Sequence, residues 1–146
     1  FNLSYINEEG KKERPVVIHR AISASLERFM SVLIEHFAGK FPLWLSPVQV
    51  KIVTVTDRSI PFAKELYRRL QSEDIRVELD DKAETIGRKV RDAQNEKVNY
   101  ILTIGDKESE QGTVAVRTRA GDVTFDVLVD DFLAMIKAKI QKKEIE

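Results

Sequence analysis

The chain has 146 residues, of which 42% are hydrophobic and 33% are charged, a composition typical of a globular domain and not of a disordered segment. Its 24 basic and 24 acidic residues give a formal net charge of zero, which disfavours a protein that holds nucleic acid mainly by its phosphates, so any such contact should be local. The absence of cysteine excludes disulfides, thiolate catalysis and cysteine-rich zinc sites within this chain, and no apolar stretch is long enough to cross a bilayer.

The first part of the chain predicts a polar arm, a strand and a helix. Residues 1–14 contain a Glu-Gly turn signal and are expected to form a loop or a hairpin. The apolar run Val16–Ile18 predicts a buried strand. Apolar residues then recur at helical spacing, so we expect a helix that begins at Ser23 or Ser25 and ends near Gly39.

The second part predicts a mixed sheet with helices packed against it. Residues 41–47 carry two prolines and two aromatic residues, which indicates a packed junction before a new domain. From residue 48 onward the hydrophobic periods give the order β-α-β-α-β-β-(β)-α. Strands are expected at 48–55, 75–79, 100–104, 113–118 and 123–128; helices are expected at 62–70, 85–93 and 129–140, the first of them capped from residues 57–59. There is no Gly-rich phosphate loop and no nucleophile elbow.

A charged corner follows the most apolar of these strands. Tyr100–Ile104 predicts a strand covered on both faces, Asp106–Glu108 comes directly after it, and the next strand carries Arg117 on a basic, wet face. Glu108 and Arg117 therefore either face one ligand or are ordinary surface charges. A carboxylate accepts from the N–H groups of guanine's pairing edge and an arginine donates to O6 and N7, so the pair suits an unpaired guanine.

Basic residues also cluster at the start of the second helix of this domain. Arg88, Lys89 and Arg91 are expected to give its early turns a basic surface. That surface either contacts RNA phosphates or is simply solvated.

Two long runs carry a resemblance to a known family. RPVVIHRAISASLERF and LIEHFAGKFPLWLSPVQV resemble the threonyl-tRNA synthetases, at the third signature motif of a class II synthetase and the crossing into the anticodon-binding domain. The resemblance implies that Arg28 binds ATP, that Ser25 belongs to the same active site and that His19 helps to hold a catalytic zinc ion. The other zinc ligands and the rest of the ATP site fall outside this sequence, so we expect no cofactor and no aminoacylation in the isolated chain.

The later motifs extend the resemblance to nearly the whole chain. ETIGRKVRDAQ, GDKE and VAVRTR are similar to the anticodon-binding domain shared by the threonyl, prolyl, histidyl and glycyl synthetases, and they favour the threonyl branch. The resemblance implies that Glu108 and Arg117 read the middle G of threonine anticodons. It also assigns Arg91, Glu84 and Lys107 to the anticodon site.

These observations predict an α/β chain in two parts. Residues 1–46 are expected to be the strand-helix end of a class II catalytic domain, and residues 47–146 an anticodon-binding domain of about five strands and three flanking helices. The chain departs from the family pattern at Ala24, where glycine is usual, and at Ala83, where asparagine is usual. Because it begins at Phe1 without methionine, we expect it to be part of a longer polypeptide.

The expected partners follow from the same resemblance. They are the anticodon loop of tRNA(Thr), the missing catalytic domain and, in the parent enzyme, a second identical subunit. We expect no membrane contact and a cytoplasmic location. The alternative is a stand-alone or accessory domain of the same fold that uses its apolar first helix for protein assembly.

Overall fold

A computed structural model describes residues 2–21 and 25–145 of the chain. The chain divides into two compact units, Phe1–Val32 and Leu33–Glu146. The predicted domain boundary at residues 46–47 remains a prediction. No helix within the described ranges combines the length and the apolar character that a membrane span requires.

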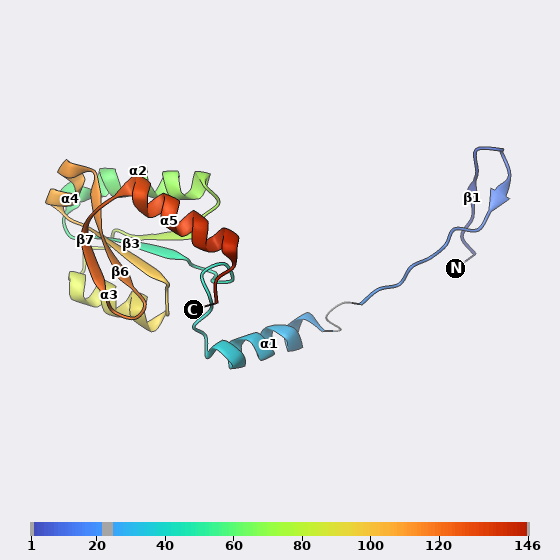
Figure 1. Ribbon diagram of the computed structural model, residues 1–146, viewed down its shortest axis with the longest axis horizontal. Coiled ribbons are helices and arrows are strands. Elements are labelled where there is room, and N and C mark those ends of the chain that lie inside the picture. Colours follow the sequence, from blue (N-terminus) through green and yellow to red (C-terminus); the bar gives the residue numbers. More distant parts are fainter. Residues whose placement is uncertain (1, 22–24, 146) are drawn as a thin grey trace. The chain divides into compact units, whose positions relative to one another are not determined.

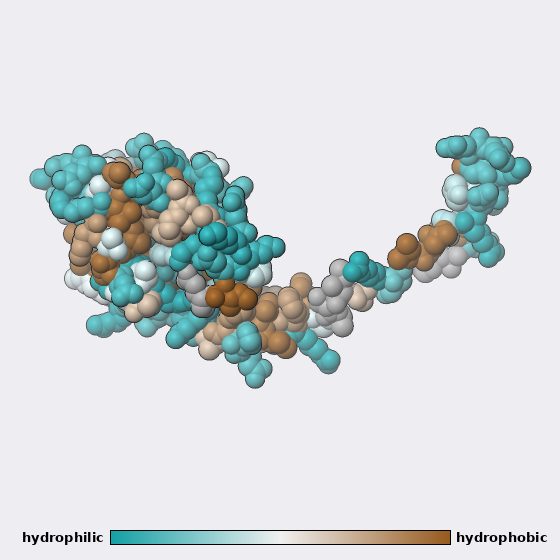
Figure 2. Space-filling model, in the orientation of Figure 1, coloured by the Kyte–Doolittle hydropathy of each residue, from teal (hydrophilic) through white to brown (hydrophobic). Residues whose placement is uncertain are grey.

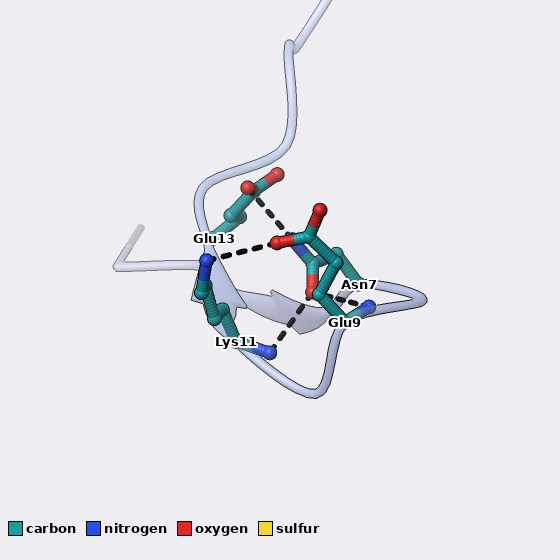
Figure 3. Close-up of polar contacts among 4 residues, drawn as sticks. All are labelled: Asn7, Glu9, Lys11 and Glu13. Atoms are coloured by element: carbon teal, nitrogen blue, oxygen red, sulfur yellow. Dashed lines mark hydrogen bonds and ion pairs between the residues drawn. The ribbon is translucent and has the colours of Figure 1, made fainter.

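The first unit begins with a small hairpin, as predicted for residues 1–14. Strand β1 (Tyr5–Ile6) pairs antiparallel with β2 (Lys12–Glu13). Asn7 organises the turn, because its side-chain oxygen accepts the backbone N–H groups of Glu9 at 3.0 Å and Lys11 at 2.9 Å (Figure 3). Its amide nitrogen also donates to Glu13 at 2.8 Å. The turn is therefore held by hydrogen bonds of the Asn7 side chain and of the backbone, and not by a hydrophobic core.

The predicted strand at Val16–Ile18 is wrong for this chain. These residues form no strand, and their side chains are 90%, 72% and 85% exposed, which gives the brown patch of this segment in Figure 2. A buried strand needs neighbouring strands to pair its N–H and C=O groups. Within the described residues, nothing supplies that pairing. The prediction that Ser23 begins the next helix lies outside the described residues, as does Ala24.

Helix α1 (Leu26–Phe37) begins at Ser25, one of the two predicted starts. The Ser25 hydroxyl oxygen accepts the backbone N–H of Arg28 at 3.3 Å, as an N-cap residue does. Gly39 follows its end in a left-handed conformation, with φ of 74°. No residue of α1 is buried, and several of its apolar side chains, such as Leu26 and Met30, are more than half exposed.

The second unit contains the predicted five-stranded mixed sheet. Its strands are β3 (Val50–Thr54), β4 (Val77–Asp80), β5 (Tyr100–Ile104), β6 (Thr113–Thr118) and β7 (Val123–Leu128). They lie in the order β4-β3-β5-β6-β7, with β3 parallel to β4 and β5, and with β6 antiparallel to β5 and β7. The predicted fold class is therefore confirmed.

Helices cover the two faces of the sheet unequally. Helices α2 (Ile60–Ser72) and α5 (Val129–Lys142) lie on one face, and α3 (Ile86–Asn95) lies on the other (Figure 1). The larger core includes Ile52 and Phe132, which are 0% and 1% exposed. The smaller core joins Val53 and Ile101 to Ala93 of α3. No residue of β6 or β7 belongs to this smaller buried cluster.

The junction at residues 41–47 packs against the sheet domain, as predicted. Leu43 and Ser46 are 4% and 3% exposed. Gln49 donates to the Leu43 carbonyl at 2.9 Å, and the Arg76 guanidinium donates to the carbonyls of Ser46 at 2.7 Å and Trp44 at 2.9 Å. These bonds satisfy the polar backbone of a segment that prolines keep out of regular structure.

Two local predictions around helix starts need correction. Pro61 lies in the first turn of α2 as predicted, but the Ser59 hydroxyl donates to the Thr56 carbonyl at 2.8 Å and makes no cap contact with the helix. Asp106–Glu108 is not a simple corner, because it forms the first turn of a short helix, α4 (Asp106–Gln111). The backbone N–H of Gly105 donates to the Glu108 carboxylate, which stabilises that turn.

Candidate nucleic-acid interface

A groove of about 480 Å³ lies on the α3 side of the sheet, where the helix cover stops short of β7. Val114 and Val116 of β6 face the larger core, so the alternating residues Ala115 and Arg117 face the groove. Strand β7 contributes Val123 and Phe125, α3 contributes Ile86, Gly87 and Val90, and α4 contributes Asp106, Lys107 and Glu108. The groove is therefore built from sheet, helix and helix start together.

Glu108 is held in place by its own helix. Its Oε2 accepts the Gly105 backbone N–H at 2.9 Å. No donor in the described part of the chain is bonded to its Oε1, so one carboxylate oxygen is fixed while the other remains available to a ligand. The fixed position matters, because a carboxylate that is already oriented loses less rotamer freedom when it binds.

Arg117 lines the same groove from β6. Its side chain is half-buried, and one guanidinium N–H donates to the Gly121 carbonyl at 3.2 Å. Ala115 beside it is 5% exposed, so this face of β6 is not the fully wet face that the alternation predicted. The remaining guanidinium donors of Arg117 have no partner among residues 2–21 and 25–145.

Helix α4 is tied to two neighbouring elements. Lys107 pairs with Asp126 of β7 at 2.8 Å, and the hydrogen bond and charge of Asp126 raise the pKa of the Lys107 ammonium above its ordinary value. The Thr56 hydroxyl also donates to the Asp106 carboxylate. Asp126 itself has a φ of 56°, a conformation that an aspartate tolerates better than most residues. These contacts fix the helix that carries Glu108.

The other two predicted anticodon residues lie outside this groove. Glu84 pairs with Arg88 at 3.2 Å and lines a neighbouring cavity of about 560 Å³, beside Lys82 and Ala83. Arg91 is exposed on α3 and lines neither cavity. The structure thus brings together Glu108, Arg117 and Lys107.

The prediction that Lys89 forms a basic surface with Arg88 and Arg91 is wrong. Its side chain is 2% exposed, and its ammonium donates to the carbonyls of Thr54 at 2.9 Å and Asp80 at 3.3 Å. These carbonyls lie at the ends of β3 and β4. Lys89 therefore anchors α3 to the sheet. The helical spacing carried a signal for this position, because Lys89 follows Ile86 by three residues and precedes Ala93 by four, on the buried face of the helix.

Sequence reasoning also missed the apolar walls of the groove. Phe125 is 68% exposed, and the small residues Gly87, Gly105 and Ala115 also line the groove. An aromatic residue in an amphipathic strand is usually core. Phe125 is not part of the core because α3 does not extend over β7, a feature of the tertiary structure that the sequence pattern does not show.

The residues assigned to a catalytic site lie in and before α1. The Ser25 hydroxyl donates to Glu27 at 2.8 Å; the backbone of Glu27 and this hydroxyl lower the pKa of the Glu27 carboxyl. Arg28 and His19 are exposed. No group of three metal-ligating side chains occurs in the described part of the chain, so His19 does not form a zinc site with other described residues.

Comparison with known proteins identifies the family. Residues 49–139 match the family model described as the anticodon binding domain. The chain belongs to this family. The chain is 55% identical over 146 residues to a threonine–tRNA ligase of Desulforamulus reducens, an alignment that covers 99% of the chain and 23% of the ligase. The chain thus spans about a quarter of this relative's length.

Solved structures agree with this assignment. The RNA binding domain of threonyl-tRNA synthetase from Cryptosporidium parvum Iowa II superposes with a TM-score of 0.75 at 34% identity, over 94% of this chain and 35% of that one. A prolyl-tRNA synthetase from Cryptosporidium parvum shares the fold, with a TM-score of 0.62 at 22% identity over 69% of this chain and 22% of that one. The resemblance to threonyl-tRNA synthetases inferred from the sequence is confirmed.

Proposed function

We propose that this anticodon-binding domain holds the anticodon loop of tRNA(Thr), with Glu108 and Arg117 reading the middle base. The observation that carries the proposal is that an oriented acid and a half-buried arginine line one groove in a chain of this family. The Oε1 of Glu108 accepts from the N–H groups of an unpaired guanine. Arg117 donates to O6 and N7 of the same base, a match that no other base provides in full.

The electrostatics support local recognition. The net charge of zero gives little general attraction for RNA, so phosphates contribute few contacts. Lys107 at the rim and Arg91 on the exposed side of α3 are the cations we assign to the backbone of the loop. Lys107 is already paired with Asp126, which limits its contribution. Glu84 we assign to the neighbouring cavity of the same site.

The proposal extends to the parent enzyme, of which this chain covers only a part. We assign the chain to a cytoplasmic, homodimeric threonine–tRNA ligase that joins threonine to tRNA with ATP. In that enzyme Arg28 and Ser25 contribute to the ATP site. His19 contributes to a zinc site whose other ligands come from the rest of the polypeptide.

The test is a titration of the 146-residue chain with anticodon stem-loops. We expect the threonine stem-loop to bind, and a change of its middle G to weaken binding. Glu108→Gln and Arg117→Lys should each weaken the binding free energy by about 1 to 3 kcal/mol, roughly 5- to 150-fold in affinity, and reduce discrimination at that base. Glu110→Gln on the same helix and Arg68→Ala on α2, which line no part of the groove, are the matched controls. The proposal would be refuted if neither a change of the middle base nor either groove variant altered the affinity.

A further inference from the structure

Phe125 is an exposed aromatic side chain in a position where the fold does not need one. It is 68% exposed on β7, the edge strand of the sheet. The phenylalanine of the nearby core, Phe132, is 1% exposed. Phe125 lines the same groove as Glu108 and Arg117, so its ring surface borders the proposed base site.

The strand register sets Phe125 diagonally across from Arg117. Arg117 pairs with Val123 across the β6–β7 ladder, and Phe125 is two residues further along β7, next to the register shift between Val114 and Val116; both side chains line the groove. One such step is about 7 Å, close to the width of a nucleobase. Ala115 forms the floor between them, and its single methyl group leaves that space open.

The opposite wall of the groove is also kept open. Gly87 lies in the first turn of α3, where glycine destabilises a helix relative to alanine. A Cβ atom added at Gly87 would meet no heavy atom of the described residues within 4 Å, and the φ of this residue is not positive. Neither packing against those residues nor backbone conformation therefore requires glycine here. A ligand that approaches α3 closely would require it.

We propose that Phe125 is the platform on which an unpaired nucleobase of the anticodon loop stacks, in the space that Gly87 and Ala115 leave open. This inference rests on the proposed function and adds a separate source of affinity to it. Every base has a π-face, so stacking on Phe125 tolerates any sequence. Glu108 and Arg117 contact the edge of the base and supply the discrimination. The apolar groove and its polar end thus have different tasks.

The test compares Phe125→Ala with wild type in the 146-residue chain, by fluorescence anisotropy with threonine stem-loops that carry each of the four middle bases. We expect Phe125→Ala to weaken binding roughly 5- to 150-fold for every stem-loop that binds, with the preference for G unchanged. Phe125→Trp, which keeps an aromatic ring, should bind the stem-loops about as tightly as wild type. Leu128→Ala on the same strand, 53% exposed and outside the groove, should leave affinity unchanged.

A second variant tests the space and not the ring. Gly87→Ala should raise the thermal midpoint, because alanine favours the helix, and at the same time weaken RNA binding, because its methyl group enters the groove. A purely structural role for Gly87 cannot give opposite signs in the two measurements.

The outcomes separate this inference from the proposed function. If wild type prefers G and Phe125→Ala binds as well as wild type, the stacking platform is overturned while the proposed function stands. A loss confined to the G-containing stem-loop also overturns it, because Phe125 would then act in discrimination. Absence of any preference in wild type refutes the proposed function itself. Circular dichroism melts of each variant check that the exposed substitutions leave the fold intact.

Discussion

Replacement of Gly105 by alanine separates the position of Glu108 from its charge. A Cβ built at Gly105 would lie 2.9 Å from Glu108 Oε2 and at ordinary contact distances of 3.8 and 3.9 Å from Val55. The backbone of Gly105, with φ of −108° and ψ of −168°, is one that alanine adopts without strain. The only group that has to move is therefore the Glu108 carboxylate, at the end of a flexible side chain.

The size of the effect follows from one hydrogen bond. Displacement of the carboxylate breaks its contact with the Gly105 N–H, and loss of such a helix-start contact costs about 1 kcal/mol. The thermal midpoint should fall by a few degrees. The cost in RNA recognition should be larger, about 1 to 3 kcal/mol at the middle anticodon base, because Glu108 no longer faces the groove in its fixed orientation.

The assay is the stem-loop titration, carried out beside urea unfolding, for Gly105→Ala, Glu108→Gln and the double variant. Because both changes act through one carboxylate, we expect the double variant to bind about as weakly as Glu108→Gln alone. Its loss of binding free energy should be smaller than the sum of the losses in the two single variants. Full retention of the preference for G in Gly105→Ala, with the expected loss of stability, would refute the view that Gly105 positions Glu108.

Three further predictions address the electrostatics and the packing. Arg91→Ala should weaken binding of all stem-loops alike and reduce the slope of log affinity against log salt by about 0.7, whereas an unchanged slope would remove Arg91 from the interface. Burial opposes the charge of Lys51, but the bonds and charges of Glu96 and Glu78 outweigh it and raise the pKa of Lys51 above 10.5. A pKa that is raised in the folded state adds stability that is complete below pH 10.5 and is lost as the pH rises through the folded-state pKa. Lys51→Met should therefore destabilise the chain at pH 7, and its urea midpoint should decline less above pH 10.5 than that of wild type. An equal decline in both proteins would contradict this prediction. Lys89→Ala should lower the free energy of unfolding by at least about 2 kcal/mol, because it removes three buried methylenes at ~0.8 kcal/mol each. A urea midpoint equal to that of wild type would show that Lys89 is not needed to hold α3 on the sheet.

The elements of the sheet domain could be predicted because their hydrophobic periods are strong. The run of Tyr100–Ile104 indicated a strand covered on both faces, and the spacing from Val129 to Ile140 indicated a helix, and both are confirmed. Helix α4 was missed because six polar residues show no apolar period, and its only signal is the spacing of Gly105 and Glu108. The prediction of a buried strand at Val16–Ile18 was wrong because residues with high β propensity form a strand only when a neighbouring strand is available to pair with them.

The groove could be predicted only at its charged end. The motifs indicated Glu108, Arg117 and Lys107, and all three line it. The exposure of Phe125 depends on how far α3 extends across the sheet, which no local pattern encodes. The inward direction of Lys89 could have been inferred, because Lys89 lies at helical spacing from Ile86 and Ala93, the residues of the buried face of α3.

The uneven helix cover separates recognition from folding. Phe125 on the open side of β7 lies outside the interior, and replacements of exposed side chains usually change stability by no more than about 0.5 kcal/mol. Exposed residues around the groove can therefore change while the sheet and its helices stay the same.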